Sequence, residues 1–327
     1  MTAEAGGLLA ALIVIVTSGL RFAVPLVLST VGGCFSAQVN VFNVALEGLM
    51  LGGAFGGFVV SDVTHSALLG VLAAITVGIA LALFIALLCV DFGANEIVVG
   101  LATNMAATGV TAVLLSGLYH SQGSFMSMRA GLIHALDPHF LAGVPVLGDI
   151  AAAIDPMVIF AVAAAVAAHW YTYHSAAGLR MRAIGDKPDA VAAAGVSVRR
   201  YRYLALGIGG ALCGAAGAYL PLNGLSLFSV GMTAGSGFIA VAAVIFAAGR
   251  PLPGAGIALL FGLASAVGIE LQRLAIPDEL VQCIPYAATI LALLVQARRR
   301  MIRERRAAAD RPRDGLGPQP TTTPEVS

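Results

Sequence analysis

The most constraining feature of this sequence is a run of 47 residues, 203–249, that contains no charged side chain. A helix crosses the apolar core of a membrane with about 20 residues, so this run is long enough for two spans. Pro221, Asn223 and Gly224 interrupt it near the middle, where a turn is expected. Charged residues make up only 11% of the whole chain, compared with about 25% in soluble domains. We therefore predict that lipid surrounds most of the chain.

Apolar stretches of spanning length recur along most of the sequence. They predict an all-α fold, a polytopic transmembrane helical bundle of about 8–10 spans, in residues 1–297. The candidate spans are residues 8–34, 44–61, 66–90, 97–118, 156–173, 203–222, 231–249, 253–271 and 281–297. The remaining segment, 298–327, is basic at first and then rich in Pro and Thr, without apolar periodicity, which predicts a disordered tail.

The segment between the first two spans, 34–48, is unusually polar for membrane depth. It contains Gln38, Asn40, Asn43 and Glu47. Non-helical backbone is tolerated within a membrane only where it is buried in protein or lines a cavity. The segment is therefore either a turn at the cytoplasmic surface or a broken segment inside the bundle.

Lysine and arginine are concentrated in two places. Six of the 18 basic residues lie between 180 and 202, and eight lie after 297. Loops rich in these residues stay in the cytoplasm, which predicts that the loop 174–202 and the C-terminus are cytoplasmic. The loop 119–155, with one basic residue, is then external, and counting back places the N-terminus outside. We expect a multi-pass protein of a bacterial inner membrane.

Four polar residues in or beside the spans are candidates for lining a solute pathway: Asn43, Glu47, Asn104 and Asn223. A carboxylate at membrane depth costs a few kcal/mol unless it is paired or hydrated, so Glu47 is the most informative of them. Asn43 lies one helical turn away and can share a face with it. In the structural alternative, Glu47 caps or cross-links helices through hydrogen bonds to backbone. Asn223, at the break between two spans, either touches solute or ends a helix.

The predicted cytoplasmic loop contains a short helical pattern. Pro188 opens an alanine-rich stretch, Asp189–Ala194, and Gly195 follows it, which is the usual order of helix start and stop residues. A short helix held at the cytoplasmic surface suits docking into a groove on a soluble partner. The alternative is a solvated basic loop that only fixes topology.

Motifs for catalysis and nucleotide binding are absent from the sequence. It contains no GxxxxGK[ST] phosphate loop and no Ser-His-Asp or Cys-His arrangement. The histidines of the external loop match no metal-ligand spacing, and the four cysteines stand alone in apolar runs. We therefore expect a transport subunit rather than an enzyme, with no metal and no cofactor of its own. ATP, if it is used, would be bound and hydrolysed by another chain, and no nucleic-acid partner is indicated.

Several motifs, in this order along the chain, resemble those of one transporter family. They are NVALEGLMLGGA at 43–54, EIVVGLATN at 96–104, GLRMRAIGDKPDAVAAAGV at 178–196, GFIAVA at 237–242 and GRPLPG at 249–254. The sequence resembles permeases of the branched-chain amino acid, ribose and nucleoside group of ABC importers, and most closely the nucleoside and simple-sugar permeases. The resemblance covers about residues 30 to 262, which is most of the membrane portion.

The resemblance implies a permease subunit that moves a small polar solute, driven by a separate ABC ATPase. A nucleoside is the first expectation, a simple sugar such as ribose the second, and a branched-chain amino acid the third. The implied partners are the ATPase, a second permease subunit (a paralogue or a second copy), an external solute-binding lipoprotein and membrane lipid. The 178–196 motif is similar to the family's coupling loop, and the residues expected to contact the ATPase are Arg182, Ala183, Gly185, Pro188, Ala192 and Gly195.

The sequence departs from the family pattern just before Asn43. Where the family usually has Glu-Arg-x-Gly, this chain has Ala37-Gln38-Val39-Asn40, so the function of the Glu-Arg pair is either absent or supplied elsewhere. An ion-coupled secondary transporter is the alternative class, but such proteins usually show inverted repeats and buried ion-coupling charges. A membrane-embedded enzyme would require clustered catalytic residues.

Overall fold

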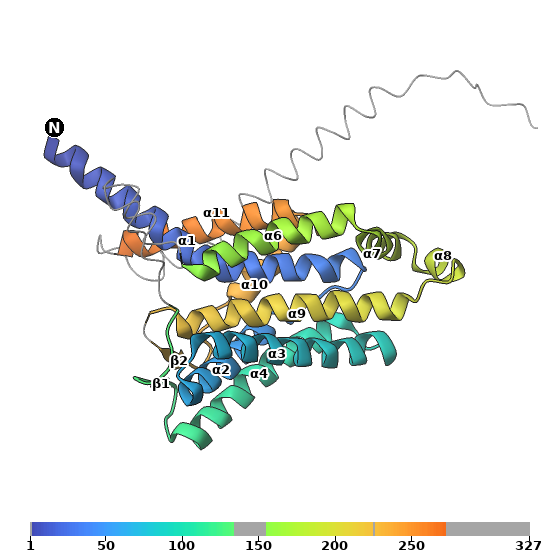
Figure 1. Cartoon of the computed structure of the whole chain (residues 1–327), viewed down its shortest axis with the longest axis horizontal. Coiled ribbons are helices and arrows are strands. Elements are labelled where there is room, and N and C mark those ends of the chain that lie inside the picture. Colours follow the sequence, from blue (N-terminus) through green and yellow to red (C-terminus); the bar gives the residue numbers. More distant parts are fainter. Residues whose placement is uncertain (1, 134–154, 225, 273–327) are drawn as a thin grey trace, which may run out of the picture. The chain divides into compact units, whose positions relative to one another are not determined.

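The computed structural model describes residues 2–133, 155–224 and 226–272, which form a bundle of helices with one small two-stranded sheet (Figure 1). The predicted all-α polytopic fold is confirmed. The elements in chain order are α1 (Thr2–Gln38), α2 (Leu46–Thr64), α3 (Ala67–Ala86), the π-helical turn η1 (Leu87–Asp91), α4 (Glu96–Tyr119), β1 (Ser124–Met126), α6 (Pro156–His174), α7 (Ala176–Asp186), α8 (Pro188–Ala193), α9 (Val198–Leu222), β2 (Leu227–Ser229), α10 (Ser236–Phe246) and α11 (Pro251–Gln272).

Seven helices in the described part are long and apolar enough to cross a membrane. They are α1 from Val14 onward, α2, α3 continued through η1, α4, α6, α9 and α11. Their positions overlap the predicted spans, with ends that differ by a few residues; α9 begins five residues earlier than expected, at Val198. The predicted span 281–297 and the tail 298–327 lie outside the described residues.

Helix α9 packs against α1, α2 and α3 and runs between α1 and α3 in Figure 1. Its run of glycines allows this close packing. A Cβ atom on Gly214 would overlap the carbonyl oxygen of Ala74 in α3, and one on Gly217 would overlap the carbonyl oxygen of Met50 in α2. Small residues let helix backbones approach closely in lipid, where no hydrophobic force brings helices together. The glycine-rich sequence of α9 is therefore explained by packing within the bundle.

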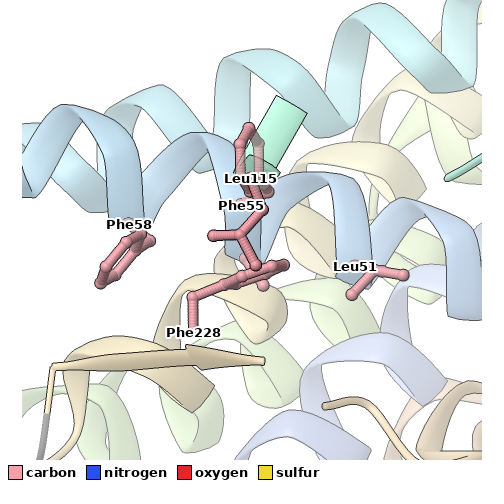
Figure 2. Close-up of a cluster of buried hydrophobic side chains, with 6 residues drawn as sticks. Leu51, Phe55, Phe58, Leu115 and Phe228 are labelled. Carbon is pink, nitrogen blue, oxygen red and sulfur yellow. The ribbon is translucent and has the colours of Figure 1, made fainter. Parts of the chain in front are cut away.

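An aromatic cluster fixes the sheet against α2 and α4. Phe55 and Phe58 of α2 pack with Leu115 of α4 and Phe228 of β2 (Figure 2). The rings of Phe55 and Phe228 meet edge to face, with centroids 5.1 Å apart, which is a favourable geometry for aromatic pairs. Strand β2 also pairs antiparallel with β1, with Phe228 opposite Phe125. The chain that follows α9 is thereby held at the end of the bundle where α4 ends.

The predicted span 231–249 differs from what the structure contains. Only Ser236–Phe246 is helical there, and 11 residues rise about 16 Å, half of the apolar core. Gly231, Ala234 and Gly235 have φ angles of 72°, 45° and 82°, so the backbone turns repeatedly before α10 begins. A charge-free composition is compatible with membrane depth but does not require the segment to be helical.

The bundle has two distinct ends, which we name by their contents. The basic end carries α7, α8 and the basic residues between 180 and 202; the sheet end carries β1 and β2. At the basic end, Asp91 of η1 accepts hydrogen bonds from Arg199 Nε and Nη2 of α9 at 2.6 and 2.7 Å. Tyr203 donates a further one at 2.7 Å. These bonds join η1, which continues α3, to the start of α9, at the C-terminal end of the predicted loop 174–202.

Candidate solute pathway and coupling surface

The link between α1 and α2 is a broken segment inside the bundle, which decides between the two alternatives for this stretch. Val41 and Val44 are buried, and the link contacts α4 at two places. The Phe42 N–H donates to the Glu96 carboxylate at the start of α4, and Gly100, one turn further along α4, packs against Val44. The link thus starts at the basic end, and α2 begins beside residues 100–104 of α4, one to two turns from the start of that helix.

Asn104 of α4 binds the C-terminal part of this link and the start of α2. Its Oδ1 accepts from the Gly48 N–H at 2.8 Å, and its Nδ2 donates to the Val44 carbonyl at 3.0 Å. The side chain is buried. Its amide accepts one hydrogen bond and donates another, both with backbone groups at the start of α2 that have no partner within the helix. A contact between Asn104 and solute stays a prediction; the geometry gives it a structural role.

Asn43 differs from Asn104 because half of its amide is unused. Its Oδ1 accepts from the Ala45 N–H at 3.0 Å, a local turn that precedes α2. Its Nδ2 is buried but has no hydrogen-bond partner among the described residues. The residue as a whole is only 8% exposed. Buried polar groups in proteins are nearly always hydrogen-bonded. Asn43 therefore offers a free donor beside the start of α2.

Glu47 lies where the N-termini of α2 and α10 meet. Its Oε1 accepts from the Gly235 N–H at 2.9 Å, and its Oε2 accepts from the Gly237 N–H at 2.6 Å. A Cβ atom on Gly237 would overlap the backbone nitrogen of Glu47. Helix N-termini favour negative charge for two reasons: their first N–H groups have no partner within the helix, and the positive end of the helix dipole lies there. The structural alternative for Glu47, a cap that cross-links two helices, is the one that its contacts match.

The structure brings three of the four candidate residues together and separates the fourth. Asn43, Glu47 and Asn104 all lie around the start of α2. Asn223 ends α9, where its N–H donates to the Tyr219 carbonyl at 3.0 Å, and its neighbour Leu222 contacts the loop that follows β1. Asn223 therefore belongs to the sheet end. Gly235 and Gly237 join the site instead. Gly237 opens the motif GFIAVA that carries part of the family resemblance, but neither glycine was among the candidate site residues.

The short helix predicted at residues 189–194 is present as α8, Pro188–Ala193. Gly195 follows with φ +81°, and the Val196 N–H returns to the Val191 carbonyl at 3.2 Å, as expected for a glycine that stops a helix. Four of the six residues of α8 are apolar Ala or Val, yet none of its residues is buried. In Figure 1 it extends beyond the ends of the long helices.

Helix α7, which the sequence did not predict, packs on the bundle and connects α8 to it. Met181 and Ile184 are buried, and a Cβ atom on Gly185 would overlap the carbonyl oxygen of Gln38 at the end of α1. Arg182 lies with its guanidinium 4.8 Å from the centre of the Tyr173 ring. Ala183 is half-buried. Among the residues expected to contact an ATPase, Gly185 is thus a packing residue, whereas Ala192 is exposed.

Gln38, in the segment that departs from the family pattern, connects α7 to α10. Its Nε2 donates to the Gly249 carbonyl at 2.6 Å, just after α10 ends. A continuous series of contacts therefore runs from Gly185 of α7 through Gln38 and along α10 to the Glu47 carboxylate. Whatever the family's Glu-Arg pair does, its place in this chain is taken by a neutral amide that binds backbone.

Comparison with known proteins agrees with this architecture. A family model described as branched-chain amino acid transport system permease component matches residues 15–293. The guanosine ABC transporter permease protein NupQ of Bacillus subtilis is 31% identical over 86% of this chain and 91% of its own length. The nucleoside ABC transporter permease protein NupC of Lactococcus lactis is 30% identical over 86% of this chain and 91% of its own. A protein of Haloferax volcanii named for glucose ABC transport, TsgC13, is 36% identical over 77% of this chain and 75% of its own.

Proposed function

Because the chain belongs to the family of branched-chain amino acid transport system permease components, we propose that it is the membrane-spanning subunit of an ABC importer for nucleosides. ATP is hydrolysed by a separate ATPase subunit, which docks on α8 from the cytoplasm. A second permease subunit, a paralogue or another copy, completes the pathway, and an external lipoprotein delivers the solute. The basic end then faces the cytoplasm of a bacterial cell, together with the C-terminus, as the distribution of arginine indicates.

The observation that carries this proposal is the exposure of α8. An apolar six-residue helix is too short to be stable alone, and here it buries none of its residues against the described chain. It is nevertheless held in place by α7, whose Gly185 packs directly on Gln38. A rigidly presented, uncovered helix is suited to a groove on a partner protein, whereas a loop that only fixes topology needs neither feature.

The nucleoside assignment is supported by the relatives and by the chemistry around α2. Two relatives that cover 86% of this chain are named for guanosine and nucleoside transport. Near the start of α2, the neutral Asn43 amide has a donor without a partner among the described residues, while the Glu47 carboxylate accepts from two backbone N–H groups. Neutral solutes rich in hydroxyl and amide groups suit such a site. A simple sugar meets the same description and is the second candidate, because the relative TsgC13 is named for glucose.

The docking of the ATPase is tested at Ala192. In the complete transporter, Ala192→Glu should abolish uptake and weaken co-purification of the ATPase, because a charged side chain replaces a methyl group on the exposed face of α8. The level of the protein in the membrane should not change. Ala192→Ser, which adds one oxygen atom, is the matched control and should retain uptake. Full ATPase association and uptake in Ala192→Glu would refute the assignment of α8.

The substrate is tested by uptake of radiolabelled guanosine, ribose and leucine into cells that express the complete transporter. Guanosine should enter, and its entry should depend on the external receptor. Entry of ribose but not guanosine would replace the nucleoside assignment with the sugar one.

A further inference from the structure

A polar cavity of about 330 Å³ lies at the basic end, between the end of α1, helix α7 and the turn from α10 to α11. The side chains that matter for its chemistry are those of Gln38, Tyr173, Arg182, Asp186 and Arg250. It is separate from the contacts around Glu47 and from the exposed face of α8. Residues of α1, α6, α7 and the turn between α10 and α11 line the cavity, so its polar groups come from distant parts of the sequence.

Neither arginine of this cavity has an acidic partner within 4.0 Å among the described residues. The Nε of Arg182 is buried and has no hydrogen-bond partner among the described residues. The one ion pair found within 4.0 Å in the described part of the chain joins Arg199 to Asp91, elsewhere at the basic end. The guanidinium of Arg182 is held over the Tyr173 ring at 4.8 Å, which fixes its orientation. The buried Arg182 N–H is thus short of an acceptor among the described residues, which is unusual for a buried polar group.

The chemistry of the cavity favours a phosphate group. Guanidinium groups bind phosphate oxygens through pairs of parallel hydrogen bonds, and two of them can grip one phosphate from two sides. Arg182, Arg250 and the exposed Asp186 together give the lining one net positive charge. A phosphodiester, which carries a single negative charge, neutralises this lining, whereas free phosphate at neutral pH brings more negative charge than the lining offsets.

The position of the cavity points to a lipid as the source of this phosphate. Tyr173 lies in the aromatic cluster Trp170, Tyr171 and Tyr173 at the end of α6, and Trp170 is 62% exposed. Tryptophan and tyrosine gather at the level of lipid headgroups, and basic pockets between helices on the cytoplasmic side bind anionic headgroups. We propose that this cavity binds the phosphate of an anionic lipid of the cytoplasmic leaflet.

A lipid bound there would connect the coupling helices to the membrane helices. Arg182 belongs to α7 and Arg250 directly precedes α11, so one phosphate would bridge α7 and the start of α11. The same cavity is bordered by Gln38, whose amide binds the Gly249 carbonyl at the end of α10. If α8 docks on an ATPase, as proposed above, the bound lipid would limit how far α7 can move relative to α10 and α11. The binding site itself does not depend on that function.

The test measures binding directly and needs no transport. The full chain is purified in detergent, and phosphatidylglycerol or phosphatidylcholine is titrated in while native mass spectrometry counts the bound lipids. A second arm titrates inorganic phosphate by calorimetry. The double variant Arg182→Gln/Arg250→Gln is compared with the native protein and with Arg202→Gln. Arg202 is the matched control, because its Nε also lacks a partner among the described residues but it does not line the cavity.

We expect phosphatidylglycerol to bind at least about tenfold more tightly than phosphatidylcholine, and the double variant to lose this preference while Arg202→Gln keeps it. Phosphate binding that the double variant loses, with no lipid preference, would support the same site with a soluble phosphate as its ligand. Equal binding of both lipids and of phosphate by the native protein and the double variant would overturn the proposal. The thermal unfolding midpoint shows whether the double variant is folded. If it is not, the lipid preference is measured in the single variant Arg250→Gln, which changes an exposed position.

Discussion

Replacing Glu47 with glutamine tests the contact that joins α2 to α10. The carboxylate accepts from the N–H groups of Gly235 and Gly237 at 2.9 and 2.6 Å. Glutamine has nearly the same shape, but its amide offers one oxygen acceptor and one NH2 donor. One of the two backbone N–H groups would then face another donor. The change removes one hydrogen bond and the negative charge, and leaves the surrounding packing in place.

The size of the effect follows from these two losses. A hydrogen bond to a charged group contributes about 1.5–3 kcal/mol, and a charge at a helix N-terminus adds about 0.3–1 kcal/mol. Glu47→Gln should therefore destabilise the native protein by about 2–4 kcal/mol. By the scaling known for soluble domains, this corresponds to a fall of roughly 5–10 °C in the thermal unfolding midpoint.

The assay compares thermal unfolding of the purified protein in detergent with uptake of labelled guanosine by the complete transporter. Asp189→Asn is the matched control for charge removal, because Asp189 is exposed in the first turn of α8 and has no side-chain partner among the described residues. Its unfolding midpoint should stay within about 1 °C of the native value, since exposed substitutions change stability little. Glu47→Asp, which keeps the charge but shortens the reach, should lie between native and Glu47→Gln.

The opposite result is also well defined. If Glu47 lined the solute pathway and did not cap α10, Glu47→Gln would change the KM for solute while the unfolding midpoint stayed at the native value. That combination would refute the capping role.

Three further predictions concern other contacts. Asn104→Leu should lower the unfolding midpoint by roughly 5 °C or more, because the backbone groups of Val44 and Gly48 lose their partners in a buried site; an unchanged midpoint would contradict this. Gly214→Ala should prevent accumulation of folded protein, because the added Cβ would overlap the backbone of α3. Gly207→Ala on the same helix should be tolerated, because the nearest neighbour of its Cβ is 3.9 Å away. The yields are compared by size-exclusion chromatography of fluorescent fusions, and equal yields would contradict the prediction. Gln38→Leu should leave ATPase co-purification intact but reduce uptake per ATP hydrolysed at least about threefold, and native coupling would mean that the bond to the Gly249 carbonyl transmits nothing.

The long helices could be predicted from the sequence because membrane spanning is a matter of length and apolarity. Charge-free stretches such as 66–90 and 97–118 correspond to α3 with η1 and to α4. The same reasoning failed for 231–249, because a charge-free composition does not distinguish a full span from a half-length helix preceded by turns. Gly231 and Gly235 were the available signal, but glycine is also abundant in the straight helix α9.

The candidate site was predicted in part. The spacing of Asn43 and Glu47 predicted that these two lie close together, whereas nothing in the sequence predicted that Asn104 lies beside them. Their partners could not be predicted, because the Gly235 and Gly237 N–H groups are backbone atoms that lie far away in sequence. Gln38 was seen only as a departure from a family pattern, and its bond to the Gly249 carbonyl required the fold. The roles of Asn43 and of the α8 residues in transport stay predictions.

The contact between Glu47 and α10 also constrains how the protein is made. The two hydrogen bonds of this carboxylate span 188 and 190 residues of sequence. At about 5–20 residues per second of synthesis, the ribosome needs roughly 10–40 seconds after Glu47 emerges before the N–H groups that donate to its carboxylate exist. During that interval α2 carries an unpartnered charge, which favours a place beside water or the insertion machinery over lipid. The second helix to be synthesised would thus be among the last to settle, and biogenesis of this chain should depend on a site that shelters α2 until α10 arrives.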